Sequence, residues 1–150
     1  MPASQFSADR RTCYRKLSHY KYQLMQDFRI PTQAYPTASV DTPYLCLAQN
    51  GKLTIKTGYA WDGPSGPTID TSTFMRASLV HDALYQLMRL AHLDDITVRK
   101  YADDLLKHIC LEDGMCRFRA WYVHRALRWF GAANARPVSS APIPIICAPK

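Results

Sequence analysis

A loop that leads directly into a long apolar helix constrains the fold of this chain more than any other feature. Residues 58–71 contain three glycines and two prolines, so we expect a sharply bending loop. Residues 73–91 carry apolar side chains around much of each helical turn, which predicts a helix with a broad buried surface. This helix brings His81, Asp82 and Tyr85 into the same stretch as the loop. Such an arrangement is typical of a functional site.

The rest of the chain predicts an α+β protein with a small N-terminal antiparallel β portion followed by three helices. Alternating side chains predict a strand within residues 14–30, and Asn50-Gly51 predicts a hairpin turn inside residues 43–56. The three prolines of residues 31–43 predict a loop. Two further helices are expected at about 97–112 and 115–130, with a helix stop at Asp113-Gly114 between them. Residues 1–135 then form one domain, and the proline-rich residues 136–150 form an extended tail.

Composition limits the class of protein and the kind of partner. A hydrophobic content of 47% indicates a folded globular chain, and a net charge of +7 fits a partner that carries phosphate, such as nucleic acid or anionic lipid. The five cysteines show no spacing for zinc, and their odd number and scattered positions indicate free thiols in a reducing compartment, packed as small buried apolar residues. We find no signal peptide and no membrane-length apolar run, so we expect a soluble protein that is not exported by a standard signal.

The His-Asp pair needs other partners to carry out chemistry. His81 and Asp82 are adjacent on a helix, so their side chains diverge by about 100° and cannot pair catalytically with each other. Tyr85 lies one turn further along, beside both. A histidine that acts as a general base needs an orienting carboxylate, and an antiparallel second helix would offer Asp103 or Asp104.

Asp82 has a different candidate role. It is expected to face the loop that contains Gly63 and Gly66. Loop carbonyl oxygens together with one carboxylate form a site of hard oxygen ligands, which suits calcium. The sequence therefore predicts a possible calcium site beside a possible general base.

His-Asp-x-x-Tyr on one helix and Ala-Asp-x-x-Leu on the next, after a glycine-rich loop, resemble phospholipase A2 over residues 58–130. The disulfide-free form found in parvovirus capsid proteins is the most similar version. The resemblance implies a helical core in which His81 deprotonates a water that attacks the sn-2 ester of a phospholipid. It also implies that Asp103 orients His81 with support from Tyr85. Asp82 would bind calcium with the loop of Gly63 and Gly66.

A second resemblance favours a different function. The same loop and helix are similar to an uncharacterised domain family that is common in tailed phages and prophages. This resemblance implies a phage context without an activity, and with it a location in the cytoplasm of a bacterial host or in a phage virion. The alternative hypothesis is therefore a non-catalytic virion structural or assembly protein, whose tail at 136–150 contacts neighbouring phage proteins. In that case His81 and Asp82 would only hold the loop against the helix.

The aromatic residues allow further expectations. Trp61 is interpreted as a core anchor, and His92 and His124 as surface residues without a role. Residues 115–130 mix four arginines with bulky aromatic side chains. We expect these aromatic side chains to pack in the core while the arginines face water. The alternative is that this helix lies on an anionic membrane surface.

Overall fold

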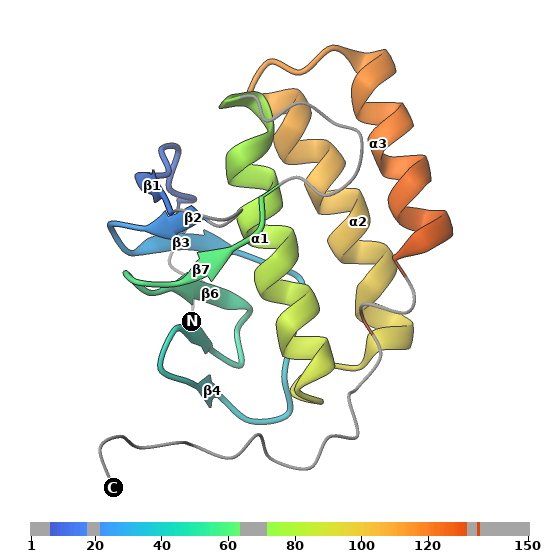
Figure 1. The fold of residues 1–150 in the computed structure, drawn as a ribbon. Helices are drawn as coiled ribbons and strands as arrows, with labels where there is room; N and C mark the ends of the chain where they lie inside the picture. Colours follow the sequence, from blue (N-terminus) through green and yellow to red (C-terminus); the bar gives the residue numbers. More distant parts are fainter. Residues whose placement is uncertain (1–6, 18–21, 64–71, 132–134, 136–150) are drawn as a thin grey trace, which may run out of the picture.

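The described residues form a layer of short strands against a layer of three helices. The structure is a computed structural model and describes residues 7–17, 22–63, 72–131 and 135. The helices are α1 (Ser72–Arg89), α2 (Asp95–Glu112) and α3 (Arg117–Phe130). Figure 1 shows α1 next to the strands, α2 beside α1, and α3 on the outer side of α2. The expected α+β class, with strands first and helices afterwards, is confirmed.

The strands form two small antiparallel sheets. The first has the order β1-β2-β7, and the second has the order β3-β6-β5-β4. Their bounds are β1 Tyr14–Lys16, β2 Tyr22–Leu24, β3 Phe28–Pro31, β4 Val40–Asp41, β5 Leu45–Leu47, β6 Lys52–Ile55 and β7 Ala60–Trp61. Their buried side chains alternate with more exposed ones in β2, β3, β5 and β6, so one face of each strand packs into the core.

Local sequence predicted the hairpin but not the other strands. Gly51 has φ of 85° and joins β5 to β6, as expected. The single strand expected within residues 14–30 is wrong, because β1 and β2 pair in one sheet while β3 pairs with β6 in the other. The loop expected at 31–43 contains β4, which pairs with the following strand β5, and the loop expected at 58–71 contains β7, which pairs with the distant strand β2.

The three helices lie close to their predicted positions. The carboxylate of Asp94 accepts hydrogen bonds from the backbone of Ile96 and Thr97, so α2 begins at Asp95 and not at Thr97. The stop after α2 is present, with φ of 95° at Gly114. Among the described residues, no helix is both long and apolar enough to cross a lipid bilayer.

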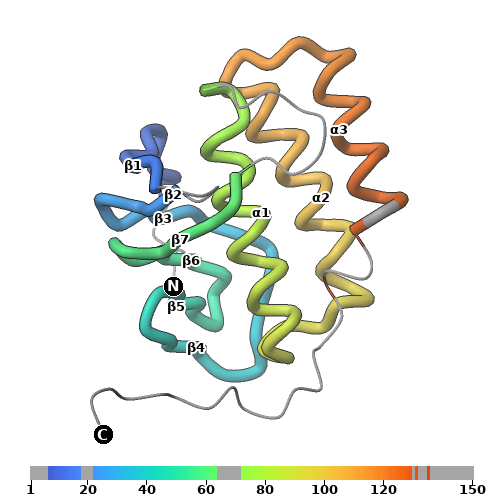
Figure 2. Tube along the Cα trace, in the orientation of Figure 1, coloured from blue at the N-terminus to red at the C-terminus, as the bar shows by residue number. Residues whose placement is uncertain are grey.

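Helix α1 is the centre of the core. Thirteen of its 18 residues are buried, because it lies between the strands on one side and α2 on the other. Figure 2 traces this central path from the end of β7 to the start of α2. Trp61 is buried, as expected for a core anchor, and its indole N–H donates to Ser78 Oγ at 3.1 Å. This contact fixes the end of β7 on α1.

Arg76 is a buried charge that sequence reasoning did not identify. Its side chain is only 3% exposed, and its guanidinium pairs with Glu112 at 2.7 Å and with Asp113 at 2.8 Å. Because Arg76 lies in the first half of α1, these ion pairs join that part of α1 to the end of α2. The two helices therefore run antiparallel.

Two expectations about side-chain burial are wrong in part. Helix α3 leaves Phe118, Trp121, Tyr122 and Trp129 exposed, because among the described elements it packs mainly on α2 and covers only a narrow stripe. The described cysteines are free, but only Cys110 is buried, while Cys13 and Cys46 are half-buried and Cys116 is exposed. Cys116 is exposed because it precedes α3 in the turn after α2.

Candidate active site

Three of the residues selected from the sequence meet between α1 and α2. Nε2 of His81 lies 2.8 Å from Oδ1 of Asp103, and the Tyr85 hydroxyl donates to the same oxygen at 2.6 Å. The rings of His81 and Tyr85 lie side by side, with centroids 4.1 Å apart, because the residues are one helical turn apart. Asp103 is fully buried, and His81 is 6% exposed. The antiparallel helices thus bring the predicted base and the predicted carboxylate into contact.

Helix α3 completes the surroundings of Asp103. Arg128 Nη1 donates to the second carboxylate oxygen of Asp103 at 3.1 Å. Arg99 lies 4.0 Å from the same oxygen, and it donates to the backbone carbonyls of Leu127 and Arg128 at the end of α3. A buried carboxylate is costly unless it is paired and hydrogen-bonded, and these groups supply both. Sequence reasoning missed Arg128, because the packing register of α3 on α2 is not visible in a local pattern.

Burial and hydrogen bonds decide which groups of this cluster carry a proton. Burial raises the pKa of Asp103, but the hydrogen bonds from His81, Tyr85 and Arg128 outweigh it and hold that pKa below its usual value. Burial, together with donation to Asp103, raises the pKa of Tyr85, so Tyr85 stays a neutral donor. An ionised carboxylate only accepts hydrogen bonds, so Nε2 of His81 carries a proton. In the neutral imidazole, Nδ1 therefore keeps the free electron pair.

Nδ1 of His81 points towards the half-exposed side of the cluster. The nearest carboxylate oxygen to it is Oδ1 of Asp82 at 3.7 Å, which is too long for a hydrogen bond, and the Asp82 side chain is 34% exposed. Burial lowers the pKa of His81, but the hydrogen bond to Asp103 and the nearby charge of Asp82 outweigh it and raise that pKa above its usual value. A histidine in this position can take a proton from a small reactant that arrives beside Asp82.

The described part of the predicted calcium loop ends at Gly63. Burial, and to a smaller extent the charge of Asp82, raise the pKa of the Tyr59 hydroxyl. Gly63 is buried with φ of 75° against the ring of Tyr22, where a Cβ atom would lie 2.6 Å from the ring. Gly66 lies outside the described residues.

Asp82 and the Gly63 carbonyl would supply at most two of the oxygen ligands of a calcium ion. Within the described ranges, no group of three or more His, Cys, Asp or Glu side chains could hold a metal ion. Calcium takes six to eight oxygen ligands, so backbone oxygens or waters would have to supply most of them.

Asp104 has a different environment from its neighbour. Its side chain is 43% exposed and pairs with Lys100 at 2.6 Å and with His124 Nε2 at 2.7 Å. Of the two candidate carboxylates, Asp103 is therefore the one that meets His81. His124, which was expected to be a surface residue without a role, is half-buried, with its side chain 18% exposed and bonded to Asp104. The expectation for His92 is correct, since it is exposed.

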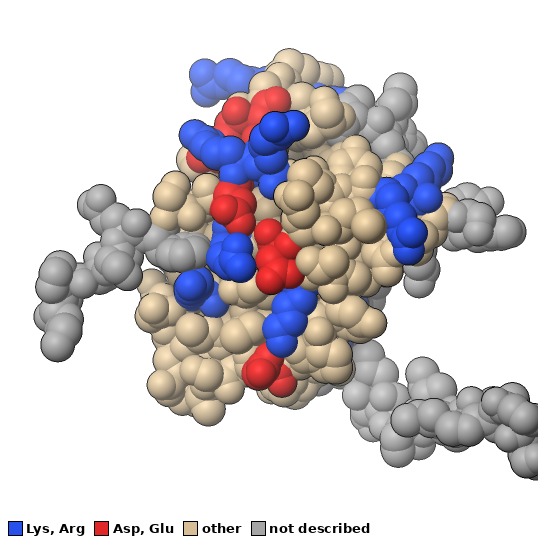
Figure 3. Space-filling model, turned by 90° about the vertical axis from the view of Figure 1, so that its left-hand side faces the viewer, with Lys and Arg blue, Asp and Glu red and all other residues tan. Residues whose placement is uncertain are grey.

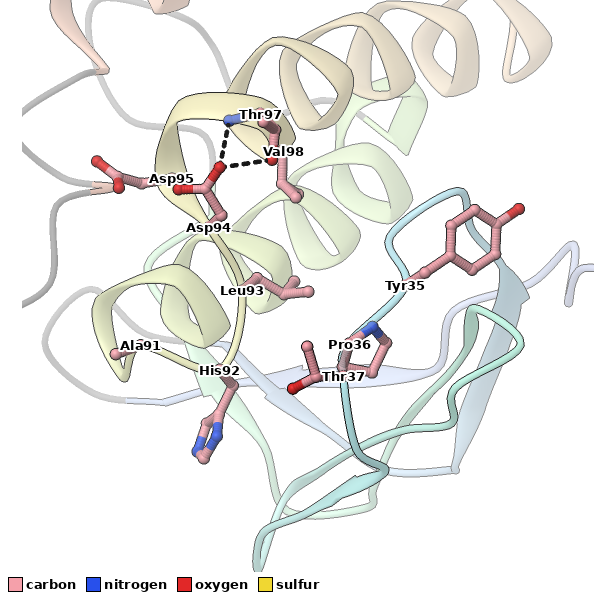
Figure 4. A pocket seen from close by; sticks show the side chains of 10 residues that line it. All are labelled: Tyr35, Pro36, Thr37, Ala91, His92, Leu93, Asp94, Asp95, Thr97 and Val98. Carbon is pink, nitrogen blue, oxygen red and sulfur yellow. Dashed lines mark hydrogen bonds between the residues drawn. The ribbon is translucent and has the colours of Figure 1, made fainter.

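A separate hollow of about 430 Å³ lies between the segment after β3 and the connection from α1 to α2. Figure 4 shows Pro36 and Thr37 across from His92 and Leu93. Of its two carboxylates, Asp94 and Asp95, Asp94 caps α2 by accepting from Thr97. None of the residues that line this hollow belongs to the His81 cluster, and their arrangement provides no base with an orienting group.

The fold and the site together define an α+β protein with a buried His-Asp-Tyr cluster between two antiparallel helices. Comparisons of the chain with protein-family models, with curated proteins and with solved structures found no match. The function must therefore be argued from the residues of this chain.

Proposed function

We propose that this protein is a phospholipase A2-like hydrolase in which His81 is the general base. The observation that carries the proposal is the contact of His81 with a fully buried, ionised Asp103. This contact protonates Nε2 and leaves Nδ1 as the basic nitrogen beside the half-exposed Asp82. Histidine held in this way by a carboxylate is the usual arrangement for a general base.

The residues of the chain would act in a defined order. Nδ1 of His81 takes a proton from a water molecule as the water oxygen attacks the carbonyl carbon of the lipid ester. Asp103 stabilises the imidazolium that forms, while Tyr85 and Arg128 hold the Asp103 carboxylate in place. The imidazolium then returns the proton to the leaving alkoxide as the ester C–O bond breaks. The products are a fatty acid and a lysophospholipid.

Calcium would support this reaction from the side of Asp82. Asp82 and the Gly63 carbonyl would hold the ion, together with loop oxygens. A calcium ion bound there would supply positive charge for the oxygen that becomes negative during attack on the ester. The residues around Asp103 do not depend on this ion.

The test is fatty-acid release from mixed vesicles of anionic and zwitterionic phospholipids, with calcium and with a chelator. Wild type should release fatty acid only with calcium, and His81→Gln should lose the activity by at least about a thousandfold. His124→Gln is the matched control, because it makes the same change in the other His-Asp contact of the helices. Absence of release by folded wild type, or equal release by wild type and His81→Gln, would overturn the proposal.

The alternative is a non-catalytic phage virion or assembly protein, and one observation favours it. The cluster around Asp103 links all three helices, so it would stabilise a scaffold even without turnover. On this alternative, His81→Gln would lower stability, and no lipid would be hydrolysed. Contacts with phage proteins through residues 136–150, which lie outside the described residues, would then be the next subject of study.

A further inference from the structure

One face of α3 exposes large aromatic side chains. Helix α3 covers α2 with a narrow stripe of Ala120 and Val123, which are buried, and Leu127, which is partly buried. The opposite face consists of Phe118, Trp121, Tyr122, Arg125 and Trp129, which we call the aromatic face. Four of these side chains are largely exposed, at 76% for Phe118, 50% for Trp121, 48% for Tyr122 and 67% for Trp129.

The spacing of these residues makes the aromatic face continuous. Trp121 and Tyr122 lie three and four residues after Phe118, Arg125 lies four and three residues after them, and Trp129 follows four residues later, so the five residues form one stripe along the helix. Figure 1 shows α3 at the outer edge of the helical layer, with α2 on its inner side. Exposed apolar patches of this kind mark interaction surfaces.

The charge of α3 narrows the choice of partner. Its 14 residues include four arginines and no acidic residue. The guanidinium of Arg125 lies between two indoles of the face, 5.8 Å from the Trp121 ring and 5.2 Å from the Trp129 ring. In contrast, acidic and basic side chains lie next to one another on the sheet side of the molecule, which Figure 3 shows. The partner of α3 is therefore expected to be both anionic and able to receive aromatic rings.

Two other kinds of partner, a second copy of this chain and single-stranded nucleic acid, fit the aromatic face less well. A second copy of α3 would bring the arginines of two helices together, and like charges in an interface are unfavourable. Single-stranded nucleic acid would stack its bases on aromatic ring faces. Here, Arg125 lies over the rings of Trp121 and Trp129 that such bases would use.

We propose that the aromatic face of α3 binds an anionic lipid surface, with the helix lying parallel to the bilayer. Tryptophan and tyrosine favour the boundary between headgroups and acyl chains, and arginine pairs with lipid phosphates at the same depth. This inference does not rest on the proposed hydrolysis, because binding needs only the side chains of α3. A protein that binds vesicles without hydrolysing them would support it equally well.

The test measures binding of the full chain to phosphatidylglycerol-phosphatidylcholine vesicles by co-sedimentation, with a chelator present to suppress any hydrolysis. Wild type should bind these vesicles and should bind pure phosphatidylcholine at least about tenfold more weakly. Trp121→Ser/Trp129→Ser should reduce binding at least about tenfold, and Arg125→Gln about fivefold. Leu90→Ser/Ile96→Ser is the matched control, because it removes two exposed apolar side chains outside α3, and its binding should equal that of wild type.

Tryptophan fluorescence gives a second measurement on the same samples. Trp61 is buried in the core, so a blue shift on adding anionic vesicles reports entry of Trp121 or Trp129 into the bilayer. The proposal is overturned if wild type does not bind, or if the folded double tryptophan variant binds as well as wild type. It is also overturned if a single-stranded DNA oligonucleotide displaces the vesicles and loses its own binding in the same variant. Blue-shifted emission of Trp121 and Trp129 in the free protein would also overturn it, because another segment or a second copy would then cover the face.

Discussion

Replacement of Asp103 by asparagine tests how strongly the buried carboxylate stabilises the three helices. Its two oxygens contact His81, Tyr85 and Arg128, and its side chain is fully buried. Breaking a buried ion pair by removing one partner costs about 3–5 kcal/mol, because the other charge stays buried. The Arg128 side chain is 32% exposed and can regain some water, so we expect the lower end, about 3 kcal/mol.

Urea unfolding followed by circular dichroism measures this loss. For a small protein the free energy of unfolding falls by about 1–3 kcal/mol per molar urea, so the midpoint should decrease by at least about 1 M. The slope should not change, because both variants bury the same surface when folded. A changed slope would instead indicate that the native or the denatured state has a different compactness.

Asp104→Asn is the matched control for this measurement. The same substitution at the next residue removes a carboxylate that is 43% exposed and that pairs with Lys100, which is 70% exposed, while the amide oxygen of asparagine can still accept from His124. Pairs of this kind contribute less than about 1 kcal/mol. Equal losses of stability in Asp103→Asn and Asp104→Asn would refute the reasoning, because burial and partners would then make no difference.

Three further predictions follow from the same contacts. Arg76→Met should cost about 2 kcal/mol in thermal or urea unfolding, because its guanidinium is buried against Glu112. Burial raises the pKa of Glu112, but the hydrogen bond and charge of Arg76 outweigh burial and hold that pKa below its usual value of 4.5. The stability that the Arg76–Glu112 pair contributes is therefore fully present above pH 4.5 and is lost as the pH falls through the lowered pKa of Glu112 in the folded protein. Wild type should therefore lose stability more steeply than Arg76→Met between about pH 5 and pH 3. Gly131→Ala would place a methyl group 2.6 Å from the Tyr85 hydroxyl and 2.6 Å from the backbone carbonyl oxygen of Leu127, so Tyr85 and the end of α3 must shift around Asp103 and lipid hydrolysis should fall by about tenfold or more. Millimolar calcium should raise the melting temperature of wild type, and Asp82→Asn should remove that rise.

Each of these predictions has an outcome that contradicts it. Parallel acid-unfolding curves for wild type and Arg76→Met would show that the ion pair with Glu112 does not contribute. Full hydrolysis by Gly131→Ala would show that Tyr85 need not stay on Asp103. A wild-type melting temperature that is the same in calcium and in chelator would contradict a calcium site at Asp82.

Local sequence was sufficient to predict the elements whose conformation depends only on neighbouring residues. The apolar pattern placed the three helices, and Asn50-Gly51 placed one turn, because these signals depend only on residues close in the chain. The contact between His81 and Asp103 could be expected because a short connection forces α1 and α2 to lie antiparallel. The choice between Asp103 and Asp104 depended on which face of α2 is buried, and the residues alone left it open.

Features that depend on distant partners could not be predicted. Strand β7 lies in a loop rich in glycine and proline and forms only because it pairs with β2. Arg128 reaches Asp103 through the packing of α3 on α2, which no local spacing reveals. The aromatic face of α3 has a pattern that also fits a core helix, and it is exposed because no further element covers it among the described residues.

The account rests on the claim that Asp103 holds His81 with Nε2 protonated and Nδ1 free. Nitrogen-15 NMR of the imidazoles measures this directly, with the His81 signals assigned by their loss in His81→Gln. Above the raised pKa of His81, the account predicts a protonated Nε2 and an unprotonated Nδ1, and loss of this preference in Asp103→Asn. A proton on Nδ1, or an unchanged spectrum in Asp103→Asn, would contradict the account.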